Sequence, residues 1–139
     1  MKISIEIANR TKKRVNIDFV KKIVQKTIRI SGILISDFSI SVAFLEKGEI
    51  KKLNRKYRQK NKATDVLSFI YASGYNKKEK TLEGELALCL EIIASRAKKN
   101  KVAFQEELSF VLSHGVLHLL GMRHGKKMYE IQDEAIGNL

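Results

Sequence analysis

Hydrophobic and polar side chains alternate along two segments of the chain, residues 2–9 and residues 38–45. A period of two is typical of strands that bury one face. Between them, residues 18–30 place apolar side chains at helical spacing, and Gly32 follows where a helix would end. The pattern predicts a strand, a helix and a second strand in succession.

The middle of the chain combines a basic helix with two strongly apolar segments. Residues 49–57 show helical spacing, with lysines and arginines on the outer face. Residues 65–71 and 85–90 are apolar on both faces, which predicts two central strands of one sheet. Residues 73–80 are polar and contain a glycine, so they are expected to form an exposed connection.

The C-terminal part predicts three helices, over residues 91–100, 104–120 and 126–136. The second is the longest, and its predicted buried stripe contains Phe104, Leu108, Val111, Leu112, Gly115 and Leu119. Together the segments predict an α+β fold in which a four-stranded mixed sheet packs against about five helices. We expect one domain spanning residues 1–139, because this length suits a single core.

The cysteine content and the distribution of apolar segments indicate a cytoplasmic protein. Cys89 is the only cysteine, so no disulfide can form within the chain, and its apolar surroundings favour a buried thiol. The N-terminus lacks the continuous apolar stretch of a secretory signal. The apolar stretch at residues 110–120 is too short to span a bilayer. We therefore expect no membrane insertion.

Positive charge is concentrated in the first part of the chain. Residues 1–80 hold 20 Lys and Arg against 7 Asp and Glu, a net charge of +13, whereas residues 81–139 hold 7 against 8, a net charge of −1. Such an excess can simply form a solvated surface, but its asymmetry favours a polyanionic partner. A nucleic acid is the leading candidate, ahead of an anionic membrane surface.

All three histidines of the chain, His114, His118 and His124, fall within eleven residues. Residues four apart on a helix lie on the same face, so His114 and His118 can reach one ion. Gly121 can adopt the left-handed conformation that ends a helix and lets the chain return His124 to that ion. We expect one Zn²⁺ at the end of the long helix, although three imidazoles also accept nickel or copper.

The same spacing resembles that of the metzincin proteases, in which a glutamate directly after the first histidine acts as the general base. Gly115 occupies that position here, so the proton acceptor would be missing. Three protein ligands leave one position of a tetrahedral ion for water or substrate, as in catalytic zinc sites. The pattern therefore favours a catalytic metal site and disfavours a protease.

A basic run lies directly before the first of the two apolar strands. Residues 51–62 contain seven lysines and arginines and no acidic residue. Such a run is usually only a solvated helix face, but this one is attached to the sheet, where a guanidinium can be held against a phosphate. Of these cations, Arg58 is our candidate for the contact with phosphate.

Several motifs together give the chain a resemblance to the YbeY family of bacterial ribosomal RNA maturation factors, described as metal-dependent, single-strand-specific endoribonucleases. The resemblance is carried by H-G-V-L-H-L-L-G-M-R-H at 114–124, L-N-R-K-Y-R at 53–58, T-D-V-L-S-F at 64–69 and G-E-L-A-L at 84–88. Isoleucine replaces the family's usual proline at 70, glutamate its aspartate at 85, and arginine an acidic residue at 123. None of these departures removes a histidine.

The resemblance implies that the three histidines hold zinc and that Arg58 contacts RNA and supports its cleavage. It also implies single-stranded ribosomal RNA as substrate, at the 3′ end of the small-subunit (16S) species, with small-subunit components as partners and no role for DNA. Asp65 and Glu85 are candidate general bases, but a strand-entry turn and a solvated strand end explain them equally well. A non-catalytic zinc-containing assembly factor remains an alternative, and a metalloprotease is a weaker one.

Overall fold

The structure is a computed structural model that describes residues 2–70, 78 and 80–137. Its helices and strands, in chain order, are β1 (Lys2–Asn9), α1 (Ile17–Ser31), β2 (Asp37–Phe44), α2 (Lys47–Arg58), β3 (Val66–Ile70), β4 (Thr81–Leu88), α3 (Leu90–Asn100), α4 (Phe104–Leu119) and α5 (Lys126–Ile136). They form an α+β domain, which confirms the predicted fold class. Most of the predicted connection at residues 73–80 lies outside the described residues.

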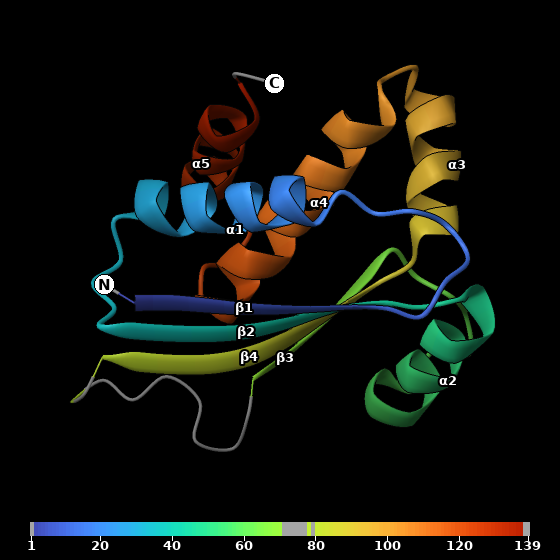
Figure 1. Cartoon of the computed structure of the whole chain (residues 1–139), viewed down its shortest axis with the longest axis horizontal. Coiled ribbons are helices and arrows are strands. Elements are labelled where there is room, and N and C mark those ends of the chain that lie inside the picture. Colours follow the sequence, from blue (N-terminus) through green and yellow to red (C-terminus); the bar gives the residue numbers. More distant parts are fainter. Residues whose placement is uncertain (1, 71–77, 79, 138–139) are drawn as a thin grey trace.

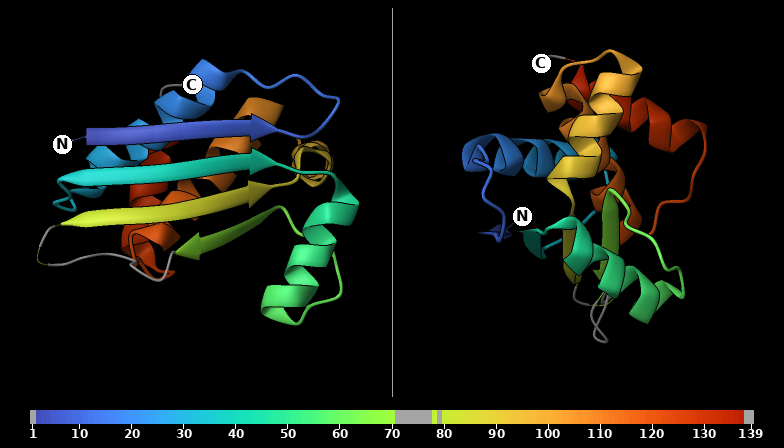
Figure 2. Two further views of the ribbon diagram at one scale, coloured as in Figure 1. Left: turned by 60° about the horizontal axis from the view of Figure 1, so that its bottom comes forward. Right: turned by 90° about the vertical axis from the view of Figure 1, so that its right-hand side faces the viewer.

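The four strands form one mixed sheet in the order β1-β2-β4-β3. Strands β1, β2 and β4 are parallel, and β3 runs antiparallel to β4. Helices α1, α4 and α5 lie on one face of the sheet (Figure 1). On the other face, the described residues place only α2, near the end at which β2 and β4 finish (Figure 2). Much of that second face is therefore free of helices.

The main core lies between the sheet and the helices of the first face. Alternate side chains of β2, from Phe38 to Phe44, are buried against apolar residues of α1 and α4. The predicted stripe of α4 is confirmed from Leu108 to Leu119, but it is wrong for Phe104, which is 39% exposed. Phe104 is the first residue of the helix, before α4 reaches the core. None of the helices in the described residues is long and apolar enough to cross a membrane.

Strand β3 lies at the edge of the sheet, so its predicted central position is wrong. Its side chains are apolar on both faces for another reason. Val66 would contact a Cβ placed on Gly115 of α4, whereas Leu67 packs into a separate apolar cluster with Ile50 of α2. Helices on opposite sides of the sheet thus cover the two faces of a strand that has only one strand neighbour.

Helix α4 crosses the sheet at very close range. A Cβ added to Gly115 would lie 2.8 Å from Cδ2 of Leu86, and one added to Gly84 would lie 2.8 Å from Cδ2 of Leu119. A buried hydrogen bond of 2.8 Å between the hydroxyls of Thr27 and Ser113 also joins α1 to α4. These contacts fix the helix that carries His114 and His118 relative to the sheet.

Candidate metal centre

The C-terminal end of α4 forms the turn that the sequence predicts. Gly121 has a φ of +82°, in the left-handed region that glycine adopts without strain. Its N–H donates to the carbonyl of His118 at 2.9 Å, and the N–H of Met122 donates to that of Leu117 at 3.0 Å. The chain therefore reverses direction directly after the helix and brings the residues beyond it back toward His118.

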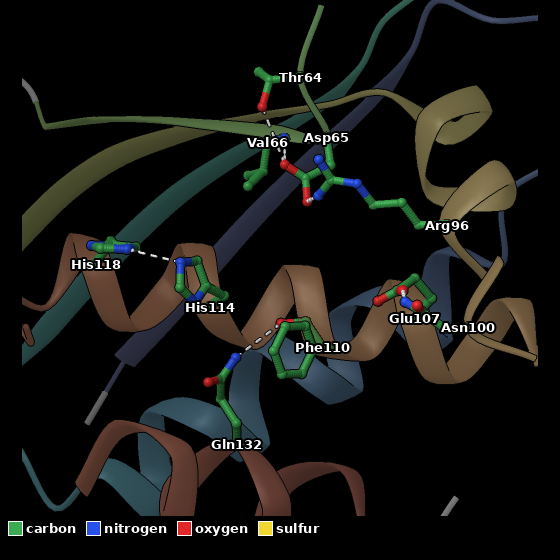
Figure 3. Close-up of polar contacts among 10 residues, drawn as sticks. All are labelled: Thr64, Asp65, Val66, Arg96, Asn100, Glu107, Phe110, His114, His118 and Gln132. Atoms are coloured by element: carbon green, nitrogen blue, oxygen red, sulfur yellow. Dashed lines mark hydrogen bonds and ion pairs between the residues drawn. The ribbon is translucent and has the colours of Figure 1, made fainter. Parts of the chain in front are cut away.

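This reversal gathers the three histidines at one point. The ring centroid of His114 lies 4.5 Å from that of His118 and 4.7 Å from that of His124, and the last two are 4.8 Å apart. One ligand nitrogen from each of the three rings lies within 4.8 Å of the others. Figure 3 shows His114 and His118 pointing to the same side of α4, where their Nε2 atoms are 2.9 Å apart.

The donor set fits a transition-metal ion. Nitrogens that share a tetrahedral zinc at 2.0–2.1 Å lie about 3.3 Å apart. The nitrogens of the three histidines are separated by distances from 2.9 Å to at most 4.8 Å, a range that includes this value. The pKa of His114 is lowered to about 4, mainly by burial and also by the neighbouring His118 and His124, against an opposing effect of Asp65. Burial and then His124 also lower the pKa of His118. Both rings are thus neutral near pH 7, which is the form that binds metals.

A cavity of about 720 Å³ lies beside the histidines, and residues of β3, α2 and α3 line its other side. Arg58, the last residue of α2, is one of them. Its Nη2 donates to the carbonyl of Ser68 on β3 at 2.7 Å, and its Nη1 to the carbonyl of Tyr57 at 3.3 Å. The structure therefore brings Arg58 and the three histidines together around one cavity, with the guanidinium anchored to the edge strand.

Asp65 lines the same cavity, but its carboxylate is already engaged. Its Oδ1 accepts hydrogen bonds from the N–H of Val66 at 2.9 Å and the hydroxyl of Thr64 at 3.2 Å. Its Oδ2 forms an ion pair with Arg96 of α3, above α4 in Figure 3. Both oxygens of this carboxylate therefore already have partners within the chain. Of its two interpretations, the strand-entry turn matches the structure better than the general base.

Arg96 is a residue of the cavity that the sequence analysis did not identify. It comes from α3, 31 residues after Asp65, and its side chain is 51% exposed. Nothing in its local sequence separates it from the other cations of that helix, because only the packing of α3 beside β3 brings it to the cavity. It places a second guanidinium near the histidines.

Glu85, the other candidate general base, points to the face of the sheet opposite the histidines. Its neighbour Gly84 faces α4, and successive residues of a strand point to opposite faces. Glu85 accordingly lines a separate cavity on the face that bears α2. The histidines and Glu85 are separated by the sheet itself, so Glu85 does not share their cavity.

Comparison with known proteins gives consistent matches over nearly the whole chain. Residues 6–136 match the model of the family described as Endoribonuclease YbeY. A protein of that name from Buchnera aphidicola is 39% identical over 127 residues, which cover 88% of this chain and 80% of the relative. Another from Thermodesulfovibrio yellowstonii is 35% identical over 158 aligned positions, covering 100% of this chain and 99% of the relative.

A solved structure supports the same relationship at the level of the fold. The solution structure of a protein from Thermotoga maritima superimposes with a TM-score of 0.65 at 28% sequence identity. The match covers 95% of this chain and 86% of the other. The similarity thus extends well beyond the histidine motif and includes the sheet and the helices that position it.

Proposed function

This chain belongs to the YbeY endoribonuclease family, and from this premise we propose that it is a metal-dependent endoribonuclease that cleaves single-stranded RNA. The observation that carries the proposal is a single cavity with three clustered imidazoles on one side and an anchored guanidinium on the other. His114, His118 and His124 hold one Zn²⁺ in this proposal, and Arg58 is the catalytic residue.

The two sides of the cavity divide the chemistry of phosphodiester cleavage. A bound zinc ion would supply Lewis acidity toward the phosphate and lower the pKa of a coordinated water. The guanidinium of Arg58 remains charged at every physiological pH and has five N–H donors. Two of its nitrogens already donate to backbone carbonyls, which fixes its plane and leaves other donors for the nonbridging oxygens, where negative charge accumulates.

Gly115 argues against peptidase chemistry on this metal scaffold. A Cβ at this position would lie 2.8 Å from Leu86 and 3.4 Å from Val66, so a side chain there would run into the sheet. A glutamate base there would require the side chain of Leu86 to move. The glycine thus suits the close helix-to-sheet contact that positions the histidines.

We further propose ribosomal RNA as the natural substrate, at the 3′ end of the 16S species, with small-subunit components as partners and the cytoplasm as the compartment. The strong positive charge of residues 1–80 supports an RNA partner. The names of the relatives support RNA cleavage. Cys89, a buried free thiol, is compatible with a reducing compartment.

The proposal is tested by incubating the purified chain with structured and unstructured RNA at matched zinc content. We expect cleavage of the unstructured RNA, loss of activity in His114→Ala, and a loss of about a hundred- to a thousandfold in Arg58→Ala. Arg29→Ala is the matched control, because Arg29 is an exposed cation at the end of α1 that does not line the cavity. Cleavage that persists unchanged in both site variants would contradict the proposal and indicate a contaminating nuclease.

A further inference from the structure

A second cavity, of about 350 Å³, lies on the face of the sheet that bears α2. Its walls are mostly apolar, from Ala43 of β2, Leu53 of α2 and neighbouring residues, and its polar groups include Glu85 and Arg10. A largely apolar cavity with a few polar groups is typical of sites that bind small ligands. The metal chemistry described above does not use this cavity.

An aromatic pair forms one side of the second cavity. The ring of Phe69 on β3 meets that of Tyr57 on α2 edge to face, with centroids 5.4 Å apart and planes at 71°. Tyr57 is nevertheless 47% exposed, so much of its ring remains accessible to a ligand. An exposed aromatic ring held in place by a second ring is the kind of platform on which single-stranded RNA bases stack.

The second cavity and the metal cavity adjoin across the edge strand. Ser68 and Phe69 are consecutive residues of β3; Ser68 lines the metal cavity and Phe69 the second one. Tyr57 and Arg58 are likewise consecutive, and the guanidinium of Arg58 lies 5.1 Å from the ring centroid of Phe69. Because β3 pairs only with β4 in the described residues, no strand covers its outer side. A nucleic-acid strand bound at Arg58 can therefore cross this edge.

Glu85 gives the second cavity its chemical preference. Its carboxylate has no hydrogen bond or ion pair with the residues that the structure describes, and Arg10 is paired instead with Glu49 at 3.5 Å. An unpaired carboxylate repels phosphate and accepts hydrogen bonds from amino groups, such as those of adenine, cytosine and guanine. The cavity is thus suited to a neutral ring with donors, while the basic face of α2 suits the RNA backbone.

We propose that the second cavity binds a nucleobase of the RNA strand whose phosphate lies at Arg58. The base stacks on Tyr57, and Glu85 accepts a hydrogen bond from its amino group. This subsite rests on the proposed function, and it explains how the cavity would favour RNA that is single-stranded, since a paired base must first be unpaired and unstacked at a cost in free energy. It also predicts a preference for amino-bearing bases over uracil.

The stacking contact is tested by the equilibrium binding of short single-stranded oligonucleotides in a His118→Ala background, which under the proposed function does not cleave them. Tyr57→Ala should weaken binding about ten- to a hundredfold, whereas Tyr57→Phe, which retains the ring, should bind normally. Tyr129→Ala is the matched control, because Tyr129 is 46% exposed but lies on α5. Oligonucleotides without bases should bind the chain that retains Tyr57 as weakly as intact oligonucleotides bind the Tyr57→Ala variant.

The role of Glu85 is tested by comparing oligocytidine with oligouridine. Glu85→Gln replaces a charged acceptor with a neutral one, so the affinity ratio of cytidine to uridine should fall several-fold. Glu83→Gln, an exposed position on the same strand and face, should leave the ratio unchanged. In the same His118→Ala background, a ratio that Glu85→Gln leaves unchanged would overturn this part of the inference.

The outcomes separate the subsite from the function on which it rests. If the chain binds and cleaves RNA while Tyr57→Ala and abasic RNA behave normally, the base subsite is wrong and the proposed function stands. If the unmodified chain neither binds nor cleaves RNA, both are wrong. Selective loss of affinity in Tyr57→Ala, with Tyr57→Phe and Tyr129→Ala unaffected, supports the subsite.

Discussion

The two walls of the metal cavity are built in different ways. On one wall, His114 and His118 project from α4, a helix whose flanking residues are almost all buried and which lies in tight contact with β4. On the other wall, Arg58 and Arg96 are surface side chains held by hydrogen bonds and one ion pair. The core thus positions the imidazoles, whereas a few polar contacts at the sheet edge position the guanidiniums.

This difference suits the two kinds of ligand. A metal ion requires its donors at fixed separations, so a wall that forms part of the core keeps them in place. An RNA backbone varies in path, and long cationic side chains at a surface can follow it. Substitutions in the α4 wall should therefore have large effects on metal binding or on stability. Substitutions in the opposite wall should have small effects on both.

The largest effect is expected from removing a ligand on the α4 wall. His118→Ala should weaken zinc binding roughly a hundred- to a thousandfold, because four-ligand zinc sites bind with about 10–16 kcal/mol, or about 2.5–4 kcal/mol per ligand. The measurement is competition with a chelator of known affinity, with circular dichroism to verify the fold. Lys126→Ala, at an exposed position of α5, serves as control. Equal zinc affinity in both variants would show that His118 is not a ligand.

A smaller effect is expected from disturbing the contact between α4 and the sheet. In Gly115→Val the new side chain would overlap Leu86, so the free energy of unfolding should fall by about 1–3 kcal/mol. Gly48→Ala is the control, and it should raise the free energy of unfolding instead. Gly48 lies in α2, where an added Cβ would meet nothing within 4 Å. Alanine favours a helix over glycine by up to about 1 kcal/mol. Urea unfolding measures both. A Gly115→Val chain as stable as the parent would mean that Leu86 or α4 shifts at little cost, and the description of this wall as rigid would then be wrong.

The same contrast explains what the sequence could predict. The histidine cluster needs only a helix, a left-handed glycine and eleven consecutive residues, so local spacing was sufficient to predict it. The edge position of β3 was mispredicted because two-sided burial does not distinguish a central strand from an edge strand covered by two helices. The side of the sheet to which Glu85 points, and the pairing of Arg96 with Asp65, depend on strand register and helix packing. Neither is encoded by neighbouring residues.

The smallest effect on stability is expected from the ion pair on the exposed wall. The side chains of Arg96 and Asp65 are 51% and 17% exposed, so solvent screens their attraction. A double-mutant cycle of Arg96→Ala and Asp65→Asn, followed by urea unfolding, should give a coupling free energy below about 1 kcal/mol that decreases with added salt. Zinc affinity should be unchanged in all three variants, because neither residue is among the proposed ligands. A coupling of several kcal/mol, insensitive to salt, would show that this wall is as firmly fixed as α4, and the distinction between a core-built and a surface-built wall would fail.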